Sequence, residues 1–291
     1  MRSWPPILVV ESTNCCNLHC IQCLRTNAAL AQRGFMSFDS FRKIIEQFPY
    51  LMSVQFSGFG EPFMNKELFE MVSFVRKTRR HCLTQVFTNG SLLDEDIACR
   101  IITSGLSMVN ISLDAISPSS YQAIRKGGDF NRIVENIKRL LVLKRKYRSR
   151  TPEVRLDFCL MDENLHERGK FLEFARSLGI LPEEVNTIRG VSSKWGYHSC
   201  LGTERIHVAD GCYSFWEIVQ ISWDGYWVLC CWEPRPEIIN FGNILEVPFR
   251  LLWNSQYVQD VRRKLYNKQF MSLPCDECCY YKFKEDVKRK I

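Results

Sequence analysis

The sequence contains no uncharged apolar run of about 18 residues, so it predicts no membrane-spanning helix. Its first residues, Met1 to Val10, are too few for a secretory signal and include Pro5 and Pro6. It also has no internal repeat, no low-complexity linker and no basic stretch with interleaved aromatic residues. We therefore expect a soluble, cytoplasmic protein that binds neither a membrane nor nucleic acid.

The net charge of +7 could by itself indicate a nucleic-acid partner. Much of the excess, however, lies in Lys138 to Arg150 and in Lys282 to Lys290, and leucines interrupt the first of these runs. That pattern is typical of a solvated helix face. The hydrophobic content of 46% in 291 residues agrees with a globular protein that has one large core, or a large domain and a smaller one.

Cysteine is abundant, with 14 residues, and without a secretory signal this indicates metal or redox chemistry rather than a disulfide framework. Cys16, Cys20 and Cys23 are spaced as C-x3-C-x2-C, with Cys15 as a spare thiol. Three thiolates on one short loop can hold three irons of a [4Fe-4S] cluster and leave the fourth iron open to a ligand. The alternative is a zinc site that recruits His19.

Short apolar runs alternate with segments of helical period along the first two thirds of the chain. This alternation predicts parallel strands joined by right-handed crossovers. Six such strands suggest an α/β fold, a partial (β/α)6 barrel over residues 1–190, whose strands end at one shared mouth. The predicted strands are Pro6 to Glu11, Ser53 to Phe56, Leu83 to Phe87, Met108 to Leu113, Val154 to Met161 and Val185 to Ile188.

The cysteine loop after the first strand resembles that of radical S-adenosylmethionine (SAM) enzymes, although that family often has an aromatic residue where this chain has Gln22. The resemblance implies that Cys16, Cys20 and Cys23 bind a [4Fe-4S] cluster and that SAM chelates its fourth iron. Ser57-Gly58-Phe59-Gly60-Glu61-Pro62 resembles the family's Gly-Gly-Glu motif, which holds the SAM ammonium group. The resemblance also implies SAM-binding roles for Asn89, after the third strand, and for Ser112 and Asp114, at the end of the fourth, which would contact the ribose. Arg125, further along the chain, would contact the SAM carboxylate.

The pattern changes over residues 191–291, where we expect a small cysteine-rich α+β domain. A hairpin is predicted around Asp224-Gly225, and a helix from Pro248 to Leu265. Four thiols give a closed set, for which a zinc site is an alternative: Cys212, Cys230, Cys275 and Cys278. The region resembles the shortened twitch form of the SPASM extension of radical SAM enzymes, which implies one auxiliary [4Fe-4S] cluster. Cys231 and Cys279 adjoin these ligands, and we expect Cys82, Cys99 and Cys159 in the core.

The resemblance implies reductive cleavage of SAM, with an electron from a partner such as flavodoxin or ferredoxin, and hydrogen abstraction from a small-molecule substrate. The cysteine spacings of both regions are similar to those of radical SAM dehydrogenases of the butirosin type, which oxidise an amino-cyclitol alcohol to a ketone. Arg189 would then face the substrate hydroxyl. The alternatives are a radical epimerase with Cys200 or Cys231 as hydrogen donor, a peptide-modifying enzyme, for which we expect an additional leader-binding domain, and a non-catalytic zinc adaptor.

Overall fold

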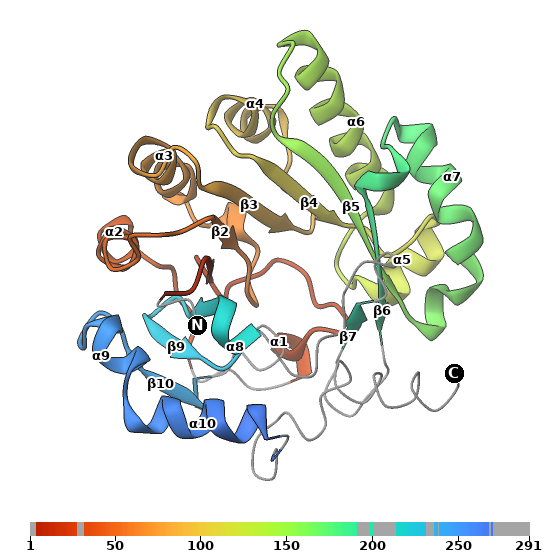
Figure 1. The fold of residues 1–291 in the computed structure, drawn as a ribbon. Coiled ribbons are helices and arrows are strands. Elements are labelled where there is room, and N and C mark those ends of the chain that lie inside the picture. The colour runs from red at the N-terminus through yellow and green to blue at the C-terminus, as the bar shows by residue number, and fades with distance from the viewer. Residues whose placement is uncertain are drawn as a thin grey trace.

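Ten strands form one sheet in the order β10-β9-β8-β1-β2-β3-β4-β5-β6-β7 in the computed structural model of the chain (Figure 1). The structure describes residues 4–27, 32–190, 198–200, 214–230, 236–237, 239–267 and 269. Neighbouring strands from β1 to β6 are parallel, as the alternation of strands and helices predicts. The predicted α/β fold with a partial (β/α)6 barrel is therefore confirmed.

The elements follow the predicted order, and the ends of the six barrel strands differ from the prediction by at most two residues. The strands are β1 Ile7–Val10, β2 Ser53–Phe56, β3 Leu83–Thr88, β4 Met108–Ser112, β5 Glu153–Leu160, β6 Val185–Gly190, β7 His198–Cys200, β8 Ile218–Ile221, β9 Tyr226–Val228 and β10 Asn240–Asn243. The helices are α1 Leu24–Asn27, α2 Phe38–Glu46, α3 Leu68–Thr78, α4 Glu95–Thr103, α5 Pro118–Ile124, α6 Phe130–Lys146, α7 Arg168–Leu178, α8 Ser214–Glu217, α9 Phe249–Trp253 and α10 Gln256–Tyr266, with 3-10 turns η1 Pro62–Met64, η2 Asp162–Glu167 and η3 Pro182–Glu184.

The core lies between the sheet and the helices α2, α3, α4, α6 and α7, which Figure 1 shows along the outer side of the curved sheet. In β2, Val54 and Phe56 are fully buried on the helix side, whereas Gln55 is only partly buried. The alternation of side chains along the strand thus places the apolar residues on the face that the helices cover. Side-chain caps start several of the helices; the carboxylate of Asp94, for example, accepts the Ile97 N–H at the start of α4. Within the described residues no helix has the length and apolarity needed to cross a membrane.

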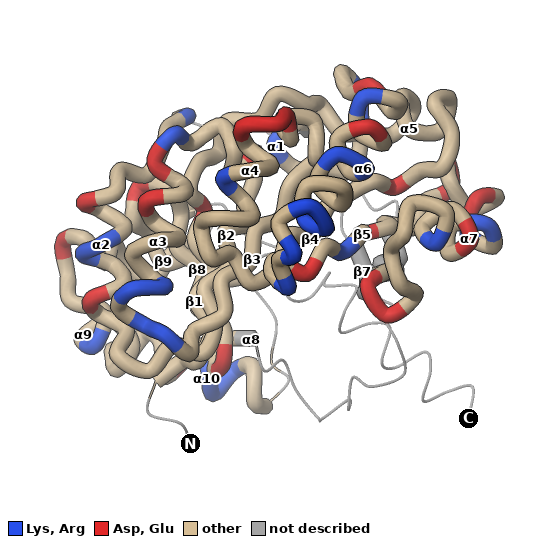
Figure 2. Tube along the Cα trace, turned by 90° about the horizontal axis from the view of Figure 1, so that it is seen from above, with Lys and Arg blue, Asp and Glu red and all other residues tan. Residues whose placement is uncertain are grey.

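Charged residues do not gather on one face of the described chain in the view of Figure 2, where basic and acidic segments are interspersed. The basic run of α6 has the predicted form, since Leu140 and Leu143 are buried while Val142 and Tyr147 are exposed. Its cations thus belong to the outer surface of an amphipathic helix.

The strands after the barrel join the same sheet, which the sequence did not predict. β8 pairs in parallel with β1, and β9 turns back antiparallel to β8 through the predicted turn at Asp224-Gly225. Gly225 has a φ of 95°, which favours glycine at that turn. The single helix predicted from Pro248 to Leu265 is wrong: α9 ends at Trp253 and α10 begins after Ser255, whose hydroxyl caps the Val258 N–H. The domain boundary near residue 190 stays a prediction.

Candidate functional site

A cavity of about 400 Å3 lies at the carboxyl ends of the barrel strands. All three thiols of the C-x3-C-x2-C loop line it, together with residues from four strand ends. The structure thus brings all of the sequence-predicted SAM-site residues to one place. The lining consists of Cys16, Cys20, Gln22, Cys23, Ser57, Gly58, Phe59, Gly60, Glu61, Phe87, Thr88, Asn89, Ser112, Asp114, Arg125, Asp157 and Cys159.

Backbone contacts hold the cysteine loop over this cavity. The N–H of Glu61 donates to the Cys15 carbonyl at 2.8 Å, and the N–H of His19 to the Lys126 carbonyl at 2.9 Å. Gly60 lies so close that a Cβ there would be 2.1 Å from the Thr13 carbonyl oxygen. The second glycine of the Ser57–Pro62 motif is therefore required for its loop to pack against the cysteine loop.

Glu61 lies within the protein, with its side chain 1% exposed, and its carboxylate organises the neighbouring strand end. It accepts the Thr88 hydroxyl and the Asn89 N–H, both at 2.7 Å. Burial raises the pKa of Glu61, while these hydrogen bonds oppose the shift. A contact of Glu61 with the SAM ammonium stays a prediction, and the geometry shows a definite role in joining the two loops.

Asn89 connects the end of β3 to the cysteine loop. Its side-chain N–H donates to Asn17 Oδ1 at 3.0 Å and lies 3.8 Å from Cys16 Sγ, while its Oδ1 accepts both the N–H and the hydroxyl of Ser91. The predicted cofactor-binding residue thus fixes the position of a predicted cluster ligand.

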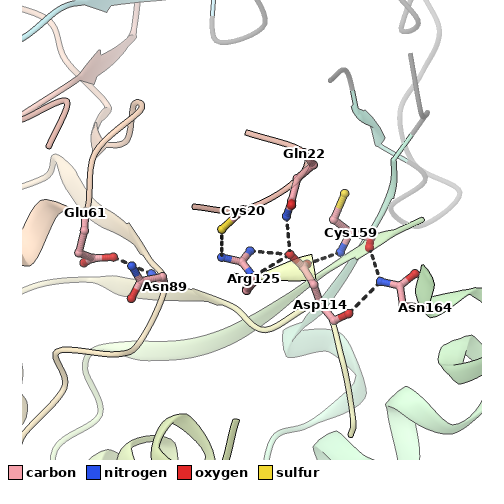
Figure 3. A network of polar contacts seen from close by, with 8 residues as sticks. All are labelled: Cys20, Gln22, Glu61, Asn89, Asp114, Arg125, Cys159 and Asn164. Carbon is pink, nitrogen blue, oxygen red and sulfur yellow. Dashed lines mark hydrogen bonds and ion pairs between the residues drawn. The ribbon is translucent and has the colours of Figure 1, made fainter. Parts of the chain in front are cut away.

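Asp114 and Arg125 form a buried ion pair beneath the cysteine loop, as Figure 3 shows. Asp114 Oδ2 accepts Arg125 Nη2 at 2.6 Å, Arg125 Nε at 2.8 Å and Gln22 Nε2 at 3.0 Å; its Oδ1 accepts the Cys159 N–H at 2.7 Å. Burial alone would lower the pKa of Arg125, but the Asp114 charge raises it above its ordinary value. Three of these donors are on Oδ2 and one is on Oδ1, so Oδ1 keeps acceptor capacity, and a ribose contact by Asp114 stays a prediction.

The same geometry supports the predicted role of Arg125, whose Nη1 lies 3.9 Å from Cys20 Sγ. A carboxylate that chelates the open iron of a cluster on Cys20 would lie near this guanidinium. The backbone of Asp114 has a φ of 58°, a strained value for a residue with a Cβ. The ion pair and the Cys159 hydrogen bond hold it there.

Cys159 is buried, as predicted, and it also lines the cavity, which the sequence did not predict. It is 6% exposed on β5, and in Figure 3 its sulfur points to the side on which Cys20 and Gln22 lie. The residues Asp157 and Cys159 both fall on the inner face of β5, because Leu156, Phe158 and Leu160 pack in the core. Strict alternation along this strand was the sequence signal that could have placed Cys159 in the cavity.

The chemistry of the thiols fits an iron-sulfur cluster. All three thiols of the loop line one cavity, where each could bind one iron of a [4Fe-4S] cluster. Burial raises the pKa of Cys16, and raises that of Cys20 to about 11 although Arg125 opposes the shift, so these thiols stay protonated until iron replaces the proton.

Glu11 is a residue of this region that sequence reasoning missed. It follows β1 and is 4% exposed; its carboxylate accepts the Phe59 N–H at 2.8 Å and the Trp223 N–H at 3.3 Å. Burial, together with the charges of Asp224 and Glu237, raises its pKa to about 7. Gly58 makes the approach possible, since a Cβ there would be 2.5 Å from Glu11 Cγ. Glu11 therefore joins the Ser57–Pro62 loop to the hairpin that β8 and β9 form.

Other predicted site residues cannot be placed as fully. Arg189 lies in β6 and Cys200 in β7, where Ile188 is the register partner of Cys200, and their side chains lie outside the described residues. Cys230 lies two residues after the end of β9 and is partly buried against the core. Four predicted residues lie outside the described part of the chain: Cys212, Cys231, Cys275 and Cys278.

Comparison of the chain with known protein families identifies its superfamily. The radical SAM superfamily matches residues 10–175, more than half of the chain, and the SPASM iron-sulfur cluster-binding domain matches residues 212–279. The chain belongs to the radical SAM superfamily. It therefore uses SAM with a [4Fe-4S] cluster, and the SPASM match implies a second cluster.

Individual relatives are distant. The chain is 24% identical to the tungsten-containing aldehyde ferredoxin oxidoreductase cofactor-modifying protein of Pyrococcus furiosus, over 93% of this chain and 86% of that protein. Its fold is similar to that of BtrN in complex with AdoMet and 2-DOIA, with a TM-score of 0.59 and 15% identity, covering 91% of this chain and 89% of BtrN. For anSMEcpe with bound AdoMet the TM-score is 0.70 at 17% identity, covering 90% of this chain and 81% of anSMEcpe.

Proposed function

We propose that this radical SAM enzyme oxidises a secondary alcohol of a small polar molecule, such as a sugar or a cyclitol, to a ketone. The observation that carries the proposal is the division of seven thiols into an open set of three and a closed set of four, on a fold similar to that of BtrN along nearly the whole of both chains. The closed set leaves no iron free for substrate, which suits electron transfer.

When bound, SAM and the two clusters would supply the radical chemistry: a 5'-deoxyadenosyl radical able to take a hydrogen atom from the alcohol carbon, and an acceptor for the remaining electron at the auxiliary cluster. The atoms balance when the hydroxyl proton goes to a base and the hydrogen atom to 5'-deoxyadenosine. A reduced flavodoxin or ferredoxin is the proposed source of the first electron.

The chain's own residues bind and orient. We assign Arg125 to the SAM carboxylate because its Nη1 lies beside Cys20, and Asp114 to the positioning of that guanidinium. Gly60 offers backbone groups to the SAM ammonium, and Ser112, which lines the cavity, a hydroxyl to the ribose. These roles follow from the family resemblance together with the distances given above.

Arg189 is the proposed contact to the substrate hydroxyl. It lies in β6, directly beside β5, whose inner face lines the cavity with Asp157 and Cys159. A guanidinium there would favour loss of the hydroxyl proton and stabilise the alkoxide that forms.

A second candidate is a radical epimerase, which the position of Cys159 in the cavity favours. A thiol can return a hydrogen atom to the substrate radical, and Cys159 joins Cys200 and Cys231 as a possible donor. In this case no electron leaves the substrate, and the product is the inverted alcohol.

One set of assays decides between the two. For the oxidation, the Cys275→Ala/Cys278→Ala variant cleaves SAM but releases no ketone, whereas the wild type consumes one SAM for each ketone formed. If an unoxidised product contains deuterium from the solvent, and the Cys159→Ala variant no longer incorporates it, the proposal of alcohol oxidation is overturned. Cys99→Ala is the matched control, because Cys99 lies on α4, near Tyr147 and away from the cavity.

A further inference from the structure

Arg25 carries a buried positive charge next to the cysteine loop that holds the predicted ligands of the first cluster. It follows Cys23 by two residues, which limits their Cα separation to about 7 Å, and it is 5% exposed. Its Nη2 donates to the carbonyl of Leu18, which lies between Cys16 and Cys20, whereas its Nε is buried without a hydrogen-bond partner. No ion pair among the described residues includes Arg25.

Such an arrangement is unfavourable unless an anion binds nearby, because a guanidinium removed from water needs a counter-charge. A second cation, Arg125, also lies near the loop, but its charge is paired with that of Asp114 at 2.6 Å. That pair adds little net charge to the site, whereas Arg25 adds a full one. The loop itself supplies the anion when it binds a cluster, since each thiol that binds iron loses its proton.

Arg25 is connected to the ligand Cys16 through Leu18 and through its charge. The Leu18 N–H donates to the Cys16 sulfur and the Leu18 carbonyl accepts Arg25 Nη2, so both polar groups of this residue are held. Burial and the charge of Glu61 raise the pKa of the Cys16 thiol, whereas the Leu18 N–H and the charge of Arg25 lower it. Without Arg25, an anion on Cys16 would face the Glu61 carboxylate with less compensation.

We propose that Arg25 is a positioning residue for the first cluster and supplies its counter-charge: the guanidinium holds the loop at Leu18 and stabilises the reduced, more negative cluster. The electron that enters the cluster adds a negative charge near a cation that water screens little. Arg25 therefore raises the reduction potential of the first cluster and makes an electron from the reducing partner easier to accept. This inference goes beyond the proposed alcohol oxidation, because it concerns the cluster and not the substrate.

The test is a redox titration of the full-length holoenzyme without SAM, followed by electron paramagnetic resonance. The Cys16→Ala/Cys20→Ala/Cys23→Ala variant identifies the signal of the second cluster, which is the internal reference. We expect Arg25→Gln to make reduction of the first cluster at least tenfold less favourable, a midpoint lower by about 59 mV or more. Arg25→Lys keeps the charge and should give a smaller decrease.

Lys126→Gln is the matched control, because Lys126 is an exposed cation whose backbone carbonyl accepts the His19 N–H of the same loop. Water and salt screen an exposed charge, so the midpoint of this variant should stay at the wild-type value.

An unchanged midpoint in Arg25→Gln overturns the proposal. Equal decreases in Arg25→Gln and Arg25→Lys also overturn it, since the shape of the guanidinium rather than its charge would then set the potential. If Arg25→Gln does not retain the first cluster, retention in Arg25→Lys supports the proposal, and loss in both variants contradicts it. Failure of the alcohol-oxidation assays would leave these measurements unaffected.

Discussion

Asp114→Asn should be among the most destabilising conservative changes in the chain. The Asp114 side chain is 1% exposed and that of Arg125 10%, and the closest contact between the two charges is 2.6 Å. Asparagine keeps the size of the side chain and tolerates the positive φ of 58° at this position. It removes the charge, however, and in either orientation of the amide its NH2 replaces one acceptor oxygen, so either Arg125 or the Cys159 N–H loses its acceptor.

Removing one partner of a buried ion pair costs about 3–5 kcal/mol, because the other charge stays buried without compensation. For a protein of this size that corresponds to a decrease of about 6–20 °C in the apparent melting temperature. Thermal unfolding of the anaerobically prepared, cluster-free protein at one fixed scan rate measures the difference. Since Arg125→Met removes the other charge, the double variant should lose at least about 1 kcal/mol less than the sum of the two single changes.

Asp260→Asn provides the matched control. It breaks the pair with Arg263, which has the same chemistry at 3.0 Å but has side chains 43% and 66% exposed. Exposed pairs contribute about 0.2–1 kcal/mol, so this variant should melt within a few degrees of the wild type. If Asp114→Asn and Asp260→Asn lower the melting temperature equally, the reasoning that burial makes the Asp114–Arg125 pair more important for stability than an exposed pair is refuted.

Three further predictions concern the site. Glu61→Gln leaves the Thr88 hydroxyl or the Asn89 N–H without its acceptor, which should lower the free energy of unfolding by about 1–3 kcal/mol. If Glu61 also contacts the SAM ammonium, loss of its charge should weaken SAM binding in calorimetry, and wild-type affinity would contradict that contact. Because the pKa of Glu11 rises from 4.5 unfolded to about 7 folded, its protonated form favours the folded state. The contribution is complete below pH 4.5 and is lost as the pH rises through 7, so denaturation from pH 4.5 to 7 should show a decrease on the order of 3 kcal/mol that Glu11→Gln lacks. Iron and sulfide analysis should find about eight irons per chain. About half of them should remain after replacement of Cys16, Cys20 and Cys23, and zinc without sulfide would exclude the two clusters.

Much of the fold follows from local pattern. The six barrel strands are apolar runs whose neighbours along the chain have helical period, and the structure pairs them in sequence order because right-handed crossovers leave few other topologies. The break between α9 and α10 was not predicted, because the apolar spacing continues across it and only the cap at Ser255 ends one helix and begins the next. Pairing of β8 with β1 is a contact between residues more than 200 positions apart, which no local pattern encodes.

The sequence by itself determined which residues meet at the site: the three thiols of one loop and the polar residues that follow the strands lie at a common edge. The closed set of four thiols stays a prediction. Only the tertiary structure decided how those side chains are used. It paired Asp114 with Arg125, directed Glu61 to Thr88 and Asn89, and placed Glu11 and Cys159 where their surroundings give them a role. The physical reason is that hydrogen-bond partners and burial depend on which elements meet, and that is decided by packing over long sequence distances rather than by the residues on either side.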